Sequence, residues 1–359
     1  MDKISIILFE LLQLSVGNRQ RLSIILSNEE WETIFCVMKK QALTGIVFDA
    51  ICHLPPEQRP PRNFILQGAA QTDLIVRQNH LLNQRVMDLN EIMSNIGLPY
   101  CILKGQGVGL LYPNPEYRNP GDIDVWCDSK DRNLMLEKVG KKYKTKETLV
   151  HHTHVDFFED IKVDLHYIPT WLFAPWYYKK LINFFTTEKN IQMNNKCELG
   201  FNVPTIKFNL VYSMLHMFWH FMSSGIGLRQ FMDYYYIILH STEWDRKEAT
   251  DVIRKIGKTK FLSAVMYVLQ NVFLLEEKYL LVKPNPQLGK ILLNEILIGG
   301  NFGFYNESNQ RSPQKSRLKN LKILFTRFLN FFTFAPSEVI CSPFWKIWHY
   351  CWRRKNGYL

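Results

Sequence analysis

The sequence lacks any long apolar run. None of its 359 residues belong to a stretch near the roughly 18 uninterrupted apolar residues that a membrane-spanning helix needs. The apolar start, MDKISIILFELLQLS, contains Glu10, so we interpret it as a helix of the mature protein and not as a signal sequence. Low-complexity segments and internal repeats are also missing. The hydrophobic content of 47% and the charged content of 21% instead predict a folded globular protein.

Paired cysteines are missing as well. The seven cysteines are scattered, odd in number, and include no Cys-x-x-Cys pair. This pattern offers no disulfide framework of the kind that stabilises small secreted domains. We therefore expect reduced thiols in a cytoplasmic protein.

Acidic residues are scarce near the end of the sequence. Residues 311–359 hold ten Lys or Arg and one acid, Glu338, which gives this segment +9 of the total charge of +11. The nearly neutral remainder argues against a basic groove that tracks a nucleic acid strand, so nucleic acid is not an expected partner.

The same segment mixes Trp, Phe and Tyr with Lys and Arg, and Pro336 and Pro343 are expected to break it into short pieces. Two interpretations remain open. The segment either makes a peripheral contact with an anionic membrane, on its inner, cytoplasmic face, or packs its aromatic residues against the body.

Hydrophobic periodicity divides the chain into four parts. Residues 1–95 are expected to be helical, with a capping-box pattern at Ser27 and Glu30. Residues 96–170 form a small α/β core, 171–310 a second helical domain, and 311–359 the basic aromatic tail. The expected fold class is therefore mixed α+β, with a small core between two helical regions.

The expected core contains several short strands. LPYCIL, residues 98–103, is followed at once by the turn KGQGVGLL, which enters a helix, and DIDVWCD forms a second strand. A polar, Lys-rich helix or loop is expected over about 129–148. The stretch LVHHTHVDFFEDIKVDLHY then indicates two strands joined by a tight turn near Glu159 and Asp160.

Three acids stand out in these strands. Residues two apart in a strand point to one face, so Asp122 and Asp124 project together. In IKVDLHY, Lys162, Asp164 and His166 alternate with apolar residues in the same way. If the two strands are neighbours in one sheet, Asp164 completes a cluster of carboxylates that suits Mg²⁺.

The turn before this cluster can serve a phosphate. Backbone N–H groups at the start of a helix bind phosphate oxygens, and Lys104 adds a positive charge beside them. The glycines of GQGVGLL have the spacing GxGxG and not GxGxxG, so we reject a dinucleotide-binding turn.

The order LKG, YPNPEYRNPGDIDVW, KVDLHY, HMFWH and GIGLRQFMD resembles an uncharacterised bacterial nucleotidyltransferase family of the polymerase-β-like superfamily. The resemblance covers about residues 25 to 240. It implies a nucleotidyltransferase fold with helical flanks, an NTP substrate, two Mg²⁺ ions with Mn²⁺ as a substitute, and transfer of a nucleoside monophosphate to an acceptor. By this comparison Gly105 matches the glycine of the phosphate turn, Asp122 and Asp124 the paired metal ligands, and Asp164 the third carboxylate.

The sequence departs from the wider superfamily at one point. The usual phosphate turn is Gly-Ser, whereas Gln106 follows Gly105 here, so Lys104, Gln106 and Arg118 are the candidates that replace the serine. The resemblance also places Arg229 beside the site, where it either contacts phosphate or forms an ion pair with Asp233 four residues later.

Several histidines have ordinary interpretations. His151, His152 and His154 are expected on an exposed strand, and His216 with His220 on a packed helix. The His216 and His220 pair lacks the intervening Glu of a zinc-enzyme helix.

The sequence therefore predicts an Mg²⁺-dependent nucleotidyltransferase with catalytic, metal-binding Asp122, Asp124 and Asp164. The nucleotide-binding residues are predicted to be Lys104, Gly105, Gln106, Arg118 and Arg229. A small molecule is the expected acceptor, with RNA or protein as less favoured acceptors. The alternative is a non-catalytic, membrane-surface accessory or nucleotide-sensing protein.

Overall fold

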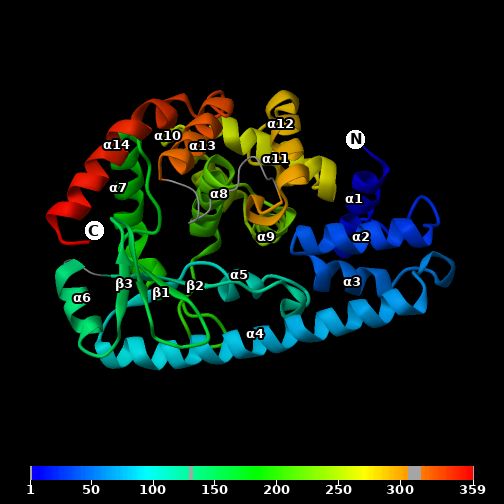
Figure 1. The fold of residues 1–359 in the computed structure, drawn as a ribbon, viewed down its shortest axis with the longest axis horizontal. Helices are drawn as coiled ribbons and strands as arrows, with labels where there is room; N and C mark the ends of the chain where they lie inside the picture. Colours follow the sequence, from blue (N-terminus) through cyan, green and yellow to red (C-terminus); the bar gives the residue numbers. More distant parts are fainter. Residues whose placement is uncertain (1, 129–131, 306–316, 359) are drawn as a thin grey trace.

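The computed structural model describes residues 2–128, 132–305 and 317–358. A five-stranded mixed sheet lies above one long helix, with further helices gathered on the opposite side and around one end (Figure 1). This mostly helical arrangement with a small sheet confirms the expected fold class. The strands are β1 (Tyr100–Ile102), β2 (Ile123–Cys127), β3 (Thr145–Thr148), β4 (His152–Val155) and β5 (Val163–His166).

The helices before the sheet are α1 (Lys3–Ser15), α2 (Asn28–Lys40), α3 (Thr44–Cys52) and α4 (Arg62–Ile96). The predicted capping box forms at the start of α2, where the Ser27 and Glu30 side chains each bond the other residue's backbone N–H. Helix α4 has 35 residues and runs the length of the molecule beneath the sheet (Figure 1). It ends at Gly97, whose φ of 67° lies in the left-handed region that glycine adopts without strain.

The strand order is β1-β2-β5-β4-β3. Strands β2 and β5 are parallel neighbours, and every other pair in this sheet is antiparallel. The register places Asp124 directly opposite Asp164. The predicted carboxylate cluster required these two strands to be adjacent, and they are.

Alternation along the strands gives the sheet two unlike faces. The apolar face carries Ile123, Val125, Val163 and Leu165, which pack against α4 and against α6 (Arg132–Gly140) in one buried cluster. The acid face carries Asp124, Asp164 and His166 from the same strands, because directly paired residues point to the same side.

The helices after the sheet are α7 (Pro175–Gln192), α8 (Ile206–Ser223), α9 (Leu228–Leu239), α10 (Glu243–Lys255), α11 (Thr259–Phe273), α12 (Pro286–Gly299), α13 (Arg317–Asn330) and α14 (Pro336–Lys355). Together with α1 to α3 they form one continuous buried cluster, which also receives Trp126 from the acid face. The four-part division of the chain stays a prediction.

Two local expectations need correction. Part of the segment expected as a Lys-rich helix or loop is strand β3, which pairs with β4. Seven residues separate β4 from β5, so the connection is a loop and not a tight turn. The helix expected after the glycine turn is present as α5 (Gln106–Gly109), which has only four residues and therefore a short helix dipole.

The basic aromatic tail also differs from its prediction. A new helix does begin at Pro336, as expected, but α14 continues through Pro343, so the expected break at that second proline is wrong. Buried contacts hold the helix in place: Glu338 pairs with Lys258 at 2.9 Å and accepts a hydrogen bond from the Phe173 amide at 2.6 Å. Both charged side chains are fully buried. Such contacts outweigh the backbone hydrogen bond that a proline removes.

Among the described residues, no helix is both long and apolar enough to cross a lipid bilayer.

Candidate active site

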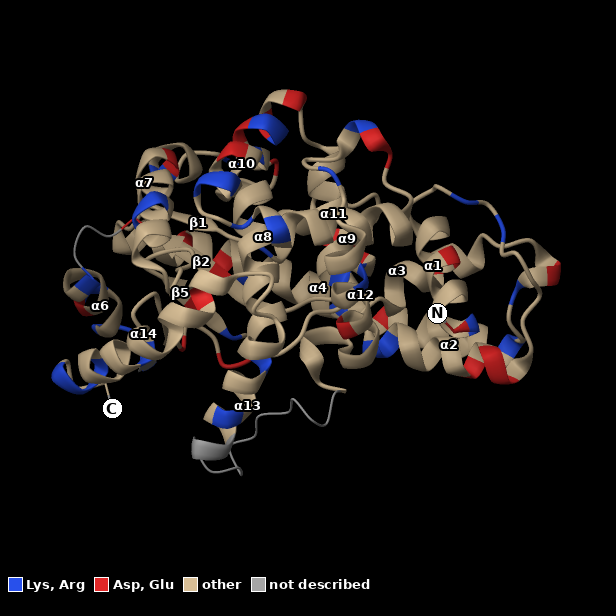
Figure 2. Ribbon diagram, turned by 90° about the horizontal axis from the view of Figure 1, so that it is seen from above, with Lys and Arg blue, Asp and Glu red and all other residues tan. Residues whose placement is uncertain are grey.

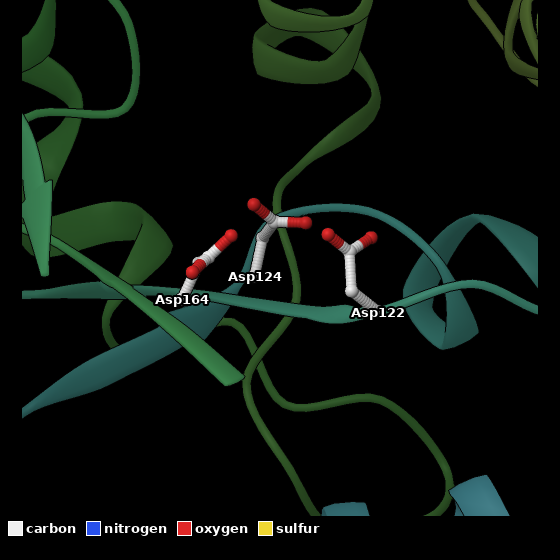
Figure 3. A group of neighbouring side chains, drawn as sticks. All are labelled: Asp122, Asp124 and Asp164. Atoms are coloured by element: carbon white, nitrogen blue, oxygen red, sulfur yellow. The ribbon is translucent and has the colours of Figure 1, made fainter. Parts of the chain in front are cut away.

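Three carboxylates meet at one edge of the sheet. Asp122 precedes β2, Asp124 lies within it, and Asp164 lies in β5, and all three side chains project to the same side (Figure 3). One oxygen from each lies within 4.8 Å of the others. Asp124 and Asp164 are buried, whereas Asp122 is half-buried and closer to solvent.

Lys104 follows β1 and neutralises part of this charge. Its Nζ lies 2.7 Å from Asp124 Oδ2 and 3.8 Å from Asp122 Oδ1. Burial by itself would raise the pKa of Asp124, but the Lys104 ammonium and a hydrogen bond from His166 outweigh it and hold the pKa well below its ordinary value. Asp124 is therefore a carboxylate at any physiological pH.

Two histidines orient the carboxylates from neighbouring strands. His166 Nε2 donates to Asp124 Oδ1 at 2.7 Å, and His154 Nδ1 donates to Asp164 Oδ1 at 2.8 Å. The interpretation of His154 as a surface residue missed this contact, because the register of β4 against β5 cannot be read from the sequence. His166 was visible as a member of the acid face through its alternation with Leu165.

The glycine turn lies directly above Asp122. Gly105 has φ 65° and ψ −112°, a conformation that side-chain-bearing residues rarely adopt, and an added Cβ would stand 3.4 Å from the Asp122 carbonyl oxygen. Gln106 donates from its amide to Asn83 on α4. The turn therefore brings backbone close to the carboxylates, while the Gln106 side chain is held toward α4.

A cavity opens beside the triad, between the turn and helices α8 and α9. It is lined by Lys104, Gly105, Val108, Arg118, Gly121, Asp122, Tyr212, Ser213, His216, Met217, Arg229, Gln230, Asp233 and Phe302. Three of these residues are cationic and two are acidic. Once a divalent ion neutralised the carboxylates, the cavity would favour an anion.

The two arginines of the cavity have different partners. Arg118 grips Asp233 with two hydrogen bonds of 2.7 and 2.9 Å, and Tyr112 also donates to Asp233. The ion pair considered between Arg229 and Asp233 is therefore replaced by one with Arg118. Arg229 instead donates to the carbonyls of Asn119 and Pro120, which form the loop that leads to Asp122. Burial and the nearby Arg118 lower the pKa of Arg229 from its ordinary value.

Two histidines on α8 complete the wall behind Lys104. His216 Nε2 lies 3.4 Å from Lys104 Nζ and 2.9 Å from His220 Nε2. Burial and the Lys104 charge keep the pKa of His216 well below its ordinary value, so its ring is neutral, and Lys104 and His220 both face the single lone pair of Nε2. Helical spacing alone could not assign this contact, since it joins residues 112 positions apart.

The three carboxylates are oxygen donors of the kind that Mg²⁺ and similar hard cations prefer. Their mutual distance, their common orientation and the ammonium group already attracted to them are consistent with a divalent metal site. The adjacent cationic cavity can accept phosphate groups. Together the two features can position a nucleotide and stabilise charge during phosphoryl transfer.

Comparison with curated proteins gives no match. Comparison with protein families gives one. A family described as uncharacterised nucleotidyltransferase matches residues 27–274, which is more than half of the chain and includes every residue of the triad and the cavity wall except Phe302. The chain therefore belongs to this nucleotidyltransferase family, and its membership implies transferase activity on an NTP.

Proposed function

We propose that the protein transfers a nucleoside monophosphate from an NTP to a small-molecule acceptor and releases pyrophosphate. The observation that carries the proposal is the triad of Asp122, Asp124 and Asp164 at the rim of a cationic cavity. Family membership supports the class of reaction. We propose ATP as the nucleotide.

The triad fits Mg²⁺, with Mn²⁺ as an alternative ion. Asp122 and Asp124 would hold two ions, and Asp164 would bind one of them. When bound, the ions would polarise the reacting phosphate and lower the pKa of the attacking hydroxyl. His166 and His154 keep the carboxylate oxygens in place through the hydrogen bonds described above.

The remaining residues bind and orient the nucleotide. Lys104 lies between the triad and the cavity, so its ammonium can move from Asp124 to the triphosphate when the carboxylates are occupied. Arg229 lines the cavity, and its Nε finds no hydrogen-bond partner in the part of the chain that the structure describes. We assign it to phosphate contact. Arg118 acts indirectly, because its guanidinium is engaged by Asp233.

The acceptor is proposed to be a small molecule with a hydroxyl or phosphate group. The cavity is bounded by residues of α8 and α9 and by Phe302, and we take these walls to suit a small molecule. The charge of the chain outside residues 311–359 is also near neutral, unlike the basic surfaces that track nucleic acid.

Calorimetric titration tests the site directly. Mg²⁺ with each of the four NTPs is titrated into the wild-type protein and into an Asp122→Ala, Asp124→Ala double variant. Metal-dependent binding is expected in the wild type and not in the variant. The control is Asp156→Ala, Asp160→Ala, which removes two acids from the loop between β4 and β5 and should bind as the wild type does.

A second measurement separates an enzyme from a nucleotide sensor. Pyrophosphate release is followed with NTP, Mg²⁺ and pooled small-molecule acceptors. Tight NTP binding without pyrophosphate release under any acceptor pool would contradict the proposed transfer and favour a sensing role.

A further inference from the structure

Helix α14 has an inner face that is fixed to the body. Glu338, Val339 and Ser342 are buried, and the Trp345 ring stacks 6.2 Å from Trp171. The preceding helix is fixed as well, since the buried Arg327 donates to the Phe221 carbonyl and pairs with Glu295 on α12. The orientation of α14 is therefore set by the fold.

The opposite, outer face of α14 is apolar, and no element among the described residues covers it. Ile340, Phe344, Ile347 and Trp348 are between 50% and 72% exposed. Their spacing of four, three and one residues places them on one side of the helix. These four side chains form an apolar stripe that continues for more than two turns of α14. Figure 1 shows the helix at the outer edge of the molecule.

Exposed large apolar residues also occur on the helix before it. In α13, Leu321, Phe325 and Leu329 follow one another at intervals of four residues and are between 47% and 52% exposed. An apolar surface of this density on consecutive helices marks a site of interaction and not an ordinary solvent face.

Basic residues continue the outer face. Arg354 and Lys355 lie seven residues after Ile347 and Trp348, so they extend the same side of α14 by two turns, and both are exposed. Figure 2 shows this end of α14 in blue. No acid accompanies them, because Glu338 is buried on the inner face.

These features select one occupant. A second copy of the chain would bring another segment of charge +9 against the first, and the two would repel each other. An exposed helix at an outer edge, with aromatic and aliphatic residues on one face and cations at its end, fits a flat anionic lipid surface. Trp is enriched at the membrane–water interface, and Phe is common on the lipid-facing side of interfacial helices.

We propose that α14 is an interfacial helix that inserts Ile340, Phe344, Ile347 and Trp348 into an anionic lipid layer, with Arg354 and Lys355 on the headgroups. The helix lies parallel to the lipid surface and joins the nucleotidyltransferase to it. This inference is independent of the proposed acceptor.

Vesicle co-sedimentation of the full chain tests the proposal. The probes are phosphatidylcholine vesicles with and without about 30% phosphatidylglycerol, an anionic lipid whose charge attracts basic residues near the surface. Wild-type protein is expected to bind the anionic vesicles about tenfold or more tightly than the neutral ones. Raising the salt concentration should weaken this binding, because screening reduces it.

Two variants divide the contributions. Phe344→Ser, Ile347→Ser, Trp348→Ser should abolish vesicle binding, whereas Arg354→Glu, Lys355→Glu should remove the preference for anionic lipid. The matched control is Leu66→Ser, Leu74→Ser on α4, two apolar residues that are 60% and 59% exposed, and it should bind as the wild type does.

Unfolding temperatures and Mg²⁺-NTP binding establish that each variant is folded. Equal binding of the wild type and the triple variant would overturn the proposal. So would a wild-type protein that ignores anionic vesicles but forms a dimer, or captures an acidic protein, through the same residues.

Discussion

The two faces of the sheet are built from the same two strands but serve opposite needs. On the apolar face, Val125 and Leu165 are fully buried against α4 and contribute to folding through the apolar surface removed from water. On the acid face, Asp124 and Asp164 stand side by side, where their like charges repel unless a cation lies between them. Neighbouring residues of one strand thus point to opposite faces, one that stabilises the fold and one that carries the proposed chemistry. Substitutions on the apolar face should lower stability and keep activity, and substitutions on the acid face should lower activity and keep stability.

The largest effect is expected for Asp124→Asn on the acid face. Loss of the carboxylate charge removes a proposed metal ligand, so kcat/KM for NTP turnover should fall on the order of 10³-fold, about 4 kcal/mol. The unfolding temperature should stay within about 5 °C of the wild type, since Lys104 keeps Asp122 as a partner. Asp128→Asn, one residue beyond β2, is the control and should remain active. An active Asp124→Asn protein would contradict the proposed role.

Leu165→Ala on the apolar face should do the reverse. Deleting a fully buried leucine side chain is expected to lower the free energy of unfolding by about 3 kcal/mol. Urea denaturation measures this loss, and Leu165→Met should cost about 1 kcal/mol or less because it conserves volume. The activity of each folded molecule should remain close to the wild type. A selective loss of activity at full stability would break the division between the faces.

A smaller effect is expected for His166→Phe, which removes the hydrogen bond to Asp124 but not the carboxylate. Groups that orient metal ligands are worth about 10- to 100-fold in metal affinity or activity. The Mg²⁺ concentration for half-maximal activity should therefore rise, and His166→Gln, which can still donate, should lose less. His53→Phe at an exposed position is the control. An unchanged Mg²⁺ dependence would show that His166 merely packs.

The smallest effect concerns pH. Burial, and then the Lys104 charge, lower the pKa of His220 to about 3, compared with an ordinary value of 6.5. Below pH 6.5 the unfolded chain binds a proton at this site that the folded chain does not, so stability falls as the pH falls toward 3.

Between pH 7 and pH 5 the resulting loss should be about 1 to 2 kcal/mol. The free energy of unfolding of His220→Gln, measured by denaturant at both pH values, should change less than that of the wild type. Equal changes would mean that His220 is accessible to protons in the folded protein.

Local sequence pattern was sufficient for the acid face and insufficient for its surroundings. Alternation in DIDVW and KVDLHY is a property of neighbouring residues, so the side-chain direction of Asp124 and Asp164 could be predicted. The adjacency of β2 and β5 was only a condition, because strand pairing depends on the packing of the whole sheet. The contact of His154 with Asp164 required the same register.

Long-range partners explain the remaining differences. Arg118 and Asp233 are 115 positions apart, so a spacing of four residues made Arg229 the nearer but incorrect partner for Asp233. Pro343 is a helix breaker by local propensity, yet the buried contacts of Glu338 and Trp345 hold α14 continuous. In both cases tertiary contacts outweighed a preference that acts over one turn.

The buried pair of Lys258 and Glu338 has a consequence for the order in which the chain is made. Lys258 directly precedes α11 and must enter an apolar interior, where an unpaired ammonium is costly, but its partner is encoded 80 positions later. At the usual rate of translation that interval lasts about 4 to 16 s. During this time the Lys258 ammonium cannot be buried at low cost, because Glu338 has not yet been synthesised. Its final compaction is therefore expected to wait for the synthesis of α14, long after the three carboxylates of the acid face have left the ribosome.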